Sequence, residues 1–179
     1  MDVYVDKNRK TVEWNVGKKI ITIHNAHILY AFKHGTNMLM IKEKDESSEI
    51  GFSTYDAEGN IVFSYKYLGN NITFRKMDIN GFDGKIISAD YQEEKTKLII
   101  LKEANEERTL LIYDEECNFI TEIKPPRDYI FISMKNNAGN IMVVAQGTND
   151  ITKDSFGRND WNFTIDLDNF YVEKRSITQ

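Results

Sequence analysis

A hairpin pattern recurs along this chain and constrains its fold more than any other feature. Its clearest copy is Glu107–Ile123 (ERTLLIYDEECNFITEI), and a close match precedes it at Glu49–Tyr65 (EIGFSTYDAEGNIVFSY). In each copy an apolar segment ends in Tyr-Asp, a short polar turn follows, and a second apolar segment begins. Fainter copies contain Asp6 and Asp166, so the pattern returns at intervals of roughly 50 residues, a period typical of strand-rich repeats such as propeller blades.

Apolar and polar residues alternate along most of the chain, with many β-branched and aromatic side chains, which predicts strands throughout. No window carries the i, i+3, i+4, i+7 spacing of an amphipathic helix, so we expect no helix longer than one turn. The predicted strands are an opening group, Asp2–Val5, Thr11–Val16 and Lys19–His24, and then three cycles of four: His27–Phe32, Met38–Lys42, Ile50–Tyr55 and Ile61–Tyr67; Lys85–Tyr91, Lys97–Lys102, Thr109–Tyr113 and Phe119–Ile123; Tyr129–Met134, Asn140–Gln146, Trp161–Asp166 and Tyr171–Ile177.

The last cycle carries a resemblance to a known kind of repeat. Pro125-Pro126 leads into its first strand, Gly139–Val144 (GNIMVV) forms its second, and Ile165-Asp166 ends its third. In these features the chain resembles β-propeller repeats of the NHL and WD-like kind. The resemblance implies an all-β fold of antiparallel four-stranded repeats, in a small or incomplete β-propeller. A small ring, an open arc, a pair of half-rings and a β-sandwich are the alternatives.

Composition narrows the class of protein. A chain of 179 residues with 41% hydrophobic and 28% charged residues suits one globular domain spanning residues 1–179. We expect no secretory signal and no membrane span, because the longest apolar runs are too short. Cys117 is the only cysteine, which is compatible with the reducing cytoplasm. A formal net charge of −5 argues against nucleic-acid binding and leaves room for a basic partner.

The residue types that carry chemistry do not assemble into a recognisable catalytic or metal motif. His24 and His27 point to opposite faces of an extended strand, and Asp78–Gly84 lacks the spacing of an EF-hand loop. Acidic neighbours would raise the pKa of a Cys117 thiol, which disfavours a nucleophile. The repeated aspartates are predicted to be turn residues whose carboxylates accept N–H bonds from two residues further on. We therefore expect no catalysis, no metal and no cofactor.

The loops are the better functional candidates. With strands that alternate in direction, the loop after the second strand of each cycle and the link between cycles leave from one rim. The third of these loops, Gly147–Asp160, and the link Leu68–Gly84 are long, and long loops in compact domains are usually functional. Phe156 and Trp161 are expected to be exposed anchors among charges. The candidate partner-binding residues are Asp45, Glu46, Glu49, Glu103, Glu106, Glu107, Asp150, Asp154, Phe156, Arg158, Asp160 and Trp161.

These features together predict a non-catalytic cytoplasmic module that binds a protein partner, with no nucleic acid and no membrane involved. A specific version is an inhibitor or immunity-type protein whose acidic rim caps a basic toxin or enzyme and steers its association. One alternative is a propeller-type hydrolase or lactonase. Another is a structural arc that completes a ring by self-association.

Overall fold

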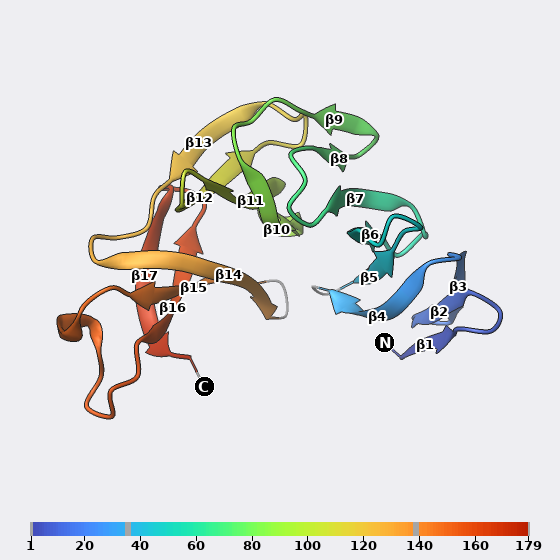
Figure 1. Cartoon of the computed structure of the whole chain (residues 1–179). Coiled ribbons are helices and arrows are strands. Elements are labelled where there is room, and N and C mark those ends of the chain that lie inside the picture. Colours follow the sequence, from blue (N-terminus) through green and yellow to red (C-terminus); the bar gives the residue numbers. More distant parts are fainter. Residues whose placement is uncertain (1, 35–36, 138–139, 179) are drawn as a thin grey trace. The chain divides into compact units, whose positions relative to one another are not determined.

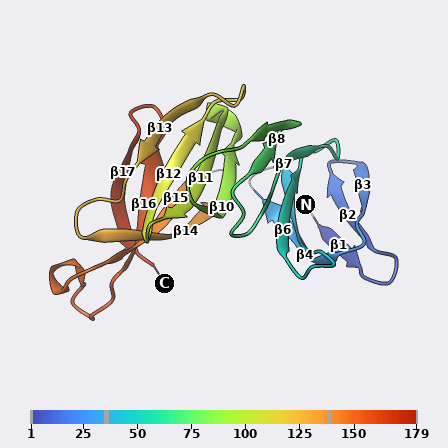
Figure 2. The ribbon, with the colours of Figure 1, turned by 45° about the horizontal axis from the view of Figure 1, so that its top comes forward.

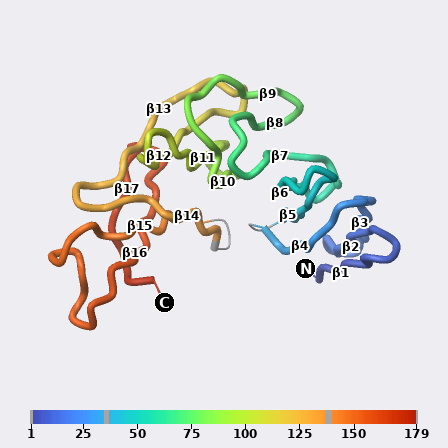
Figure 3. Tube along the Cα trace, in the orientation of Figure 1, coloured from blue at the N-terminus to red at the C-terminus, as the bar shows by residue number. Residues whose placement is uncertain are grey.

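The computed structural model describes residues 2–34, 37–137 and 140–178 of the chain (Figure 1). Two compact units divide the chain, Met1–Phe82 and Asp83–Gln179, and each is described here by itself. Figure 3 follows the chain through the seventeen strands that the described ranges contain. Every strand pairing in the described residues is antiparallel, so the prediction of an all-β fold is confirmed.

The first unit contains two sheets. Its three-stranded sheet has the order β1-β2-β3, and its six-stranded sheet runs from β4 to β9 in sequence order. The strands are β1 (Val3–Asp6), β2 (Thr11–Val16), β3 (Lys19–His24), β4 (Ile28–His34), β5 (Met38–Lys44), β6 (Ile50–Tyr55), β7 (Ile61–Lys66), β8 (Ile72–Phe74) and β9 (Met77–Ile79).

The second unit consists of two four-stranded sheets, β10-β11-β12-β13 and β14-β15-β16-β17, which lie against one another (Figure 2). The strands are β10 (Lys85–Gln92), β11 (Lys97–Ala104), β12 (Glu107–Tyr113), β13 (Phe119–Ile123), β14 (Tyr129–Asn137), β15 (Asn140–Gly147), β16 (Asp160–Asp166) and β17 (Tyr171–Ile177). In the described ranges the helical elements are two single turns of 3₁₀ helix, Glu93–Lys95 and Asp150–Thr152, so the expectation of no longer helix is confirmed.

One expectation about the strands is wrong. The link Leu68–Gly84 was expected to be irregular, but β8 and β9 form a hairpin within it and extend the second sheet to six strands. Arg75 and Lys76 turn this hairpin with φ values of 48° and 68°. Residues other than glycine seldom adopt positive φ, so the composition of this turn gave no signal for a hairpin.

The three four-stranded repeats share a β-bulge that the sequence pattern did not reveal. In the first strand of each repeat the register shifts by one residue, before Tyr30, Ser88 and Ser133. Their partners are Lys42, Leu101 and Val144, and each partner is the fifth residue of the second strand, β5, β11 or β15. A bulge increases local twist and is a conserved device at sheet rims. The repeat is therefore a repeat of backbone structure as well as of residue pattern.

The aspartates of the two clearest hairpins form the same turn. The backbone N–H of Asp56 donates to the carbonyl of Asn60 at 2.9 Å, and that of Asp114 donates to Asn118 at 3.0 Å. In return, the asparagine N–H groups donate to Oδ1 of the aspartates at 2.8 and 2.7 Å. The N–H two residues after each aspartate bonds the same carboxylate, at 2.9 and 3.1 Å, as predicted.

Asp6 and Asp166 cap a second type of turn that is one residue longer. The carboxylate of each accepts N–H bonds from the residues two and three positions further on, at 2.9 to 3.0 Å. The turns end at Lys10 and Phe170, with φ values of 56° and 57°. The four aspartates therefore share their capping role but divide into two pairs by turn geometry.

Each unit has its own apolar core. In the first unit, Trp14 is buried against Tyr55 with ring centroids 6.5 Å apart, so the three-stranded sheet packs on the face of β5 and β6. In the second unit, side chains from both four-stranded sheets meet; the buried members are Ile99, Leu101, Leu110, Ile112, Ile123, Phe131, Ile141, Val143, Ala145, Phe163 and Leu167. Among the described residues, no helix has the length and apolar character needed to cross a lipid bilayer.

Candidate functional site

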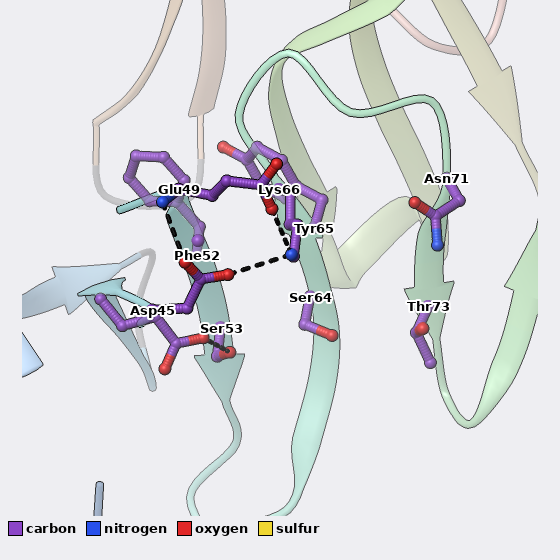
Figure 4. Close-up of a pocket in the computed structure, with 11 residues that line it drawn as sticks. Asp45, Glu49, Phe52, Ser53, Ser64, Tyr65, Lys66, Asn71 and Thr73 are labelled. Carbon is purple, nitrogen blue, oxygen red and sulfur yellow. Dashed lines mark hydrogen bonds and ion pairs between the residues drawn. The ribbon is translucent and has the colours of Figure 1, made fainter. Parts of the chain in front are cut away.

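The predicted rim residues of the first unit surround one lysine. Lys66, at the end of β7, forms ion pairs with Asp45 at 3.0 Å and with Glu49 (Figure 4). Asp45 also caps its own turn, accepting the backbone N–H of Glu49 at 2.9 Å and the hydroxyl of Ser47 at 2.6 Å. The acidic character expected of this loop is therefore partly neutralised within the loop. Glu46 is exposed to solvent.

These contacts shift the titration of the groups involved. The Ser47 hydroxyl bond, followed by the Lys66 ammonium, holds the pKa of Asp45 well below its ordinary value. The pKa of Lys66 is raised, first by its hydrogen bond to Glu49 and then by the bond to Asp45. Both groups are exposed, so this network orders side chains and contributes little to folding stability.

Beside this network lies a pocket of about 270 Å³ on the face of β5 to β8. Figure 4 shows the Lys66 network along one side, with Ser64, Asn71 and Thr73 following across the sheet. The lining residues are Glu43, Asp45, Glu49, Gly51, Phe52, Ser53, Ser64, Tyr65, Lys66, Asn71 and Thr73. Three carboxylates and one ammonium give the lining an excess of negative charge, and the hydroxyl and amide groups can both donate and accept hydrogen bonds.

Gly51 creates the floor of this pocket. It lies opposite Glu43 in the register of β5 and β6. A Cβ at position 51 would approach Cγ and Oε1 of Glu43 to 3.1 Å, so the absent side chain leaves the space in which Glu43 lies. The Glu43 carboxylate accepts hydrogen bonds from the amide of Asn25 at 2.5 Å and from the hydroxyl of Ser53 at 3.4 Å. The pocket floor is therefore a positioned carboxylate.

An equivalent pocket of about 220 Å³ occurs in the second unit, on β11 to β13. Lys102 occupies the register of Glu43, and Thr109, opposite it, occupies that of Gly51. Here the carboxylate comes from Glu122, which pairs with Lys102 at 3.4 Å and accepts the Thr109 hydroxyl at 2.6 Å. The Thr109 bond and then the Lys102 charge lower the pKa of Glu122.

In the third repeat the same position is occupied by Trp161, which lies opposite Ala145. Its indole N–H donates to the carbonyl of Thr152 at 2.8 Å, and the ammonium of Lys174 lies 3.3 Å from the ring centroid. Trp161 is partly buried against the core of the second unit. Trp161 is therefore not the fully exposed anchor that was expected, because sheet packing places its ring against the core of the second unit.

The long loop 148–159 between β15 and β16 is ordered by a polar network. Asn149 caps the 3₁₀ turn Asp150–Thr152, accepting the N–H of Thr152 at 3.3 Å. The buried hydroxyl of Thr152 donates to the Asn149 carbonyl at 2.6 Å and lies 2.7 Å from Oδ1 of Asn159. Asn159 in turn donates to the carbonyl of Gly147. Buried, satisfied polar networks of this kind hold a backbone in one conformation.

Two large apolar side chains project from this ordered loop. Ile151 is 93% exposed and Phe156 is 82% exposed, so the prediction of an exposed Phe156 is confirmed. Phe156 lies in a turn closed by Asp154, whose carboxylate accepts the N–H of Phe156 at 2.9 Å. The guanidinium of Arg158 lies over the Phe156 ring at 5.4 Å. The loop therefore presents apolar surface on a backbone that is already ordered.

Three of the six predicted acidic residues of the second unit, Glu103, Asp150 and Asp154, form ion pairs. Arg108 pairs with Glu103 at 2.7 Å and also donates to the carbonyl of Ile132 at 3.1 Å. Within the loop 148–159, the Asp150–Lys153 and Asp154–Arg158 pairs are 2.6 and 2.7 Å long. Glu106 lies in the exposed turn between β11 and β12, and Glu107 is exposed at the start of β12. Asp160 accepts a bond from Gln146 at 3.0 Å. The acidic rim expected from the sequence is therefore partly neutralised by ion pairs in this unit.

Sequence reasoning missed the residues that form the pocket floors. Gly51 within a strand pattern was the available signal, because glycine inside a strand often marks a place where another group approaches closely. For the other chemistry considered, His24 and His27 are exposed at a strand end, and His34 is buried with its ring 6.2 Å from that of Phe63. In the described ranges, no group of three His, Cys, Asp or Glu side chains is placed to hold one metal ion.

Comparison with known proteins gives no family assignment. No protein-family model matches the chain, and a search of curated proteins finds no match. The fold and the pockets define the class in structural terms, as an all-β protein of antiparallel sheet repeats with polar pockets at equivalent register positions.

Proposed function

We propose that this chain is a non-catalytic protein-binding module that anchors a partner protein through the loop 148–159. The observation that carries the proposal is the combination of an ordered backbone with exposed apolar side chains. Ile151 and Phe156 project from a loop whose polar groups are bonded within the protein. Large exposed aromatic and aliphatic side chains on a pre-ordered surface are typical of interface anchors.

Two free-energy terms decide how strongly this loop can bind, the burial of apolar side chains and the ordering of the backbone. Fully burying an aromatic or aliphatic side chain such as Phe156 or Ile151 contributes about 1.5–3 kcal/mol each. Ordering a flexible loop on binding would offset this gain, because each immobilised residue loses conformational freedom. Since the Thr152 and Asn159 network already orders the loop, most of this conformational entropy is lost when the chain folds and not when it binds.

The charges of the loop indicate the chemistry of the partner. Lys153 and Arg158 pair with acidic residues of the same loop, so the exposed apolar side chains project from a surface that is nearly neutral. The proposed contact is therefore an apolar recess on the partner. The net charge of −5 on the whole chain favours approach by a basic protein, as for an inhibitor or immunity-type protein. The single cysteine favours a reducing compartment such as the cytoplasm.

The test places a photo-reactive phenylalanine analogue at position 156 and identifies the protein that it captures in the native cell. The expected result is one captured protein whose binding is weakened about tenfold or more by Phe156→Ala. Phe119→Ala is the matched control, since Phe119 is exposed at the start of β13 in the same unit. Equal loss from both variants, or retention of the partner by Phe156→Ala, would contradict the proposal. A cross-link to a second copy of this chain would instead favour self-association.

A further inference from the structure

The pocket over Gly51 belongs to the first unit, whereas the loop 148–159 proposed as the partner contact belongs to the second. Its floor carries the Glu43 carboxylate, which accepts hydrogen bonds from Asn25 and Ser53. An ionised carboxylate has about four acceptor positions, and these two bonds fill about half of them. The missing side chain at Gly51 leaves the space above the sheet in which Glu43 lies.

The sister pocket shows which chemistry suits this position. There, a lysine ammonium and a carboxylate meet across the same strands, as Lys102 and Glu122, 3.4 Å apart. In the first unit these two positions are held by Glu43 and Ser64, so an acid is present at the lysine's position. Lys66, opposite Gly51 on β7, pairs with Asp45 and Glu49. The second unit thus has a lysine at the position where the first unit has Glu43.

The lining of the pocket in the first unit includes one lysine, Lys66. Lys66 of β7 lies between Asp45 and Glu49 at the end of the pocket, which shows that ammonium groups fit the carboxylates of this lining. With Lys66 counted, the lining still has more carboxylates than cations, since Glu43 adds a third acid. A cation of small size is the complement of that excess charge.

We propose that the pocket over Gly51 binds an alkylammonium group, with Glu43 as its carboxylate partner. Ser53 and Ser64 add hydroxyl oxygens beside the bound cation, and Asn71 closes the far side of the lining. The volume of about 270 Å³ lies just below the usual range of sites for drug-sized ligands and suits a group the size of a lysine side chain. The ammonium belongs either to a free small amine or to a lysine side chain of a bound protein.

The test uses n-butylammonium chloride as the probe and backbone amide NMR of the full chain as the readout. The expected result is saturable shifts at Gly51, Ser53 and Thr73, with the amides of Thr109 and Glu107 in the sister pocket as internal references. Butyramide, the neutral analogue, and sodium chloride at equal ionic strength should leave these amides unshifted. Shifts that do not saturate, or that spread equally over exposed acidic turns such as Asp56, would overturn the proposal.

Two variants separate loss of the site from loss of the fold. Gly51→Thr installs the residue of the sister pocket, and its Cβ meets Glu43 at 3.1 Å. The double variant Glu43→Lys with Ser64→Glu installs the ion pair of the sister pocket. Its new carboxylate is therefore already paired with a lysine of the same chain. Both are expected to keep the strand circular dichroism of the parent and to weaken probe binding about tenfold or more, the usual effect of losing a charge-assisted hydrogen bond. Unchanged binding in the folded double variant would overturn the proposal.

A further pair of probes distinguishes the two sources of the ammonium. A blocked Gly-Lys-Gly peptide is compared with n-butylammonium and with the same peptide acetylated on the lysine. Tighter binding of the peptide assigns the site to a protein lysine, and tighter binding of n-butylammonium assigns it to a free amine. Equal binding of the acetylated and unmodified peptides would overturn the proposal, because acetylation removes the charge. Since the pocket lies in the first unit, Phe119→Ala, at an exposed position of the second unit, serves as a binding-competent control here.

Discussion

Asn118 donates two hydrogen bonds to the carboxylate of Asp114, from its backbone N–H to Oδ1 at 2.7 Å and from its side-chain amide to Oδ2 at 3.0 Å. Asn60 bonds Asp56 in the same way, at 2.8 and 3.2 Å. A carboxylate that accepts several N–H bonds is stabilised in its charged form. The repeat is thus maintained by a turn that depends on an ionised aspartate.

The first prediction concerns the pH dependence of this turn. The Asn118 side-chain bond, assisted by backbone N–H bonds, lowers the pKa of Asp114. Its folded pKa lies below its unfolded value, so the stabilisation is fully present above about pH 5 and is lost as the pH falls through the folded pKa. Asp114→Asn should therefore lower the melting temperature by about 2–4 °C at pH 7 and have almost no effect near pH 2. Glu116→Gln removes a charge without the cap and is the control. An Asp114→Asn deficit of equal size at both pH values would contradict this account.

The second prediction concerns a residue in a left-handed conformation. Cys117 has φ of 65° where its counterpart Gly59 has φ of 90°. A side chain in this region costs about 1–2 kcal/mol, and glycine loses part of that advantage through its greater freedom in the unfolded chain. Cys117→Gly should raise the free energy of unfolding by about 0.5–1 kcal/mol, measured by chemical denaturation.

The reverse substitution at the sister turn provides the comparison. Gly59→Ala adds a Cβ at positive φ and brings it to 3.0 Å from Cγ2 of Ile21. It should lower the free energy of unfolding by about 1–2 kcal/mol. If the two substitutions change the free energy of unfolding in the same direction, positive φ does not determine the stability of this turn.

The third prediction concerns the order of the loop 148–159. A Cβ at Gly147 would lie 1.8 Å from the Thr152 hydroxyl and 2.3 Å from Oδ1 of Asn159. Gly147→Ala should therefore break the network and expose the loop, so that trypsin cleaves after Lys153 and Arg158 about tenfold faster. Thr148→Ala, at the exposed neighbouring position, should leave the cleavage rate unchanged. Equal cleavage of Gly147→Ala and the parent protein would show that the network does not order the loop.

The fourth prediction compares two adjacent residues of β14. Phe131 is fully buried between the two sheets of the second unit, whereas Ile130 is 43% exposed. Phe131→Ala should lower the free energy of unfolding by about 3–5 kcal/mol, because it removes apolar contacts and leaves a cavity. Ile130→Ala should cost about 1 kcal/mol or less. Urea denaturation measures both values, and similar costs for the two variants would place β14 in the wrong register.

Local features of this protein follow from the residues alone. Alternation of apolar and polar side chains predicts Thr11–Val16, Ile50–Tyr55 and Phe119–Ile123 with the bounds that the structure has. The aspartate turns are also readable in the sequence, because capping involves residues two to four positions apart. The β8–β9 hairpin escaped prediction since its turn, at Arg75 and Lys76, lacks the glycine or asparagine that usually accompanies positive φ.

The candidate sites depend on the tertiary structure. Glu43 meets Gly51 and Ser53 only through strand pairing, and Lys66 reaches Asp45 across the end of the sheet. Trp161 is predicted as an exposed anchor from its neighbours in the chain, yet sheet packing places it against the core of the second unit. The sequence by itself determined where strands and turns occur, because these depend on side-chain alternation and on contacts within a few residues. Only the tertiary structure decided which carboxylates are paired, which aromatic side chains are exposed and where the pockets lie, because those outcomes depend on residues that pairing and packing bring together from distant parts of the chain.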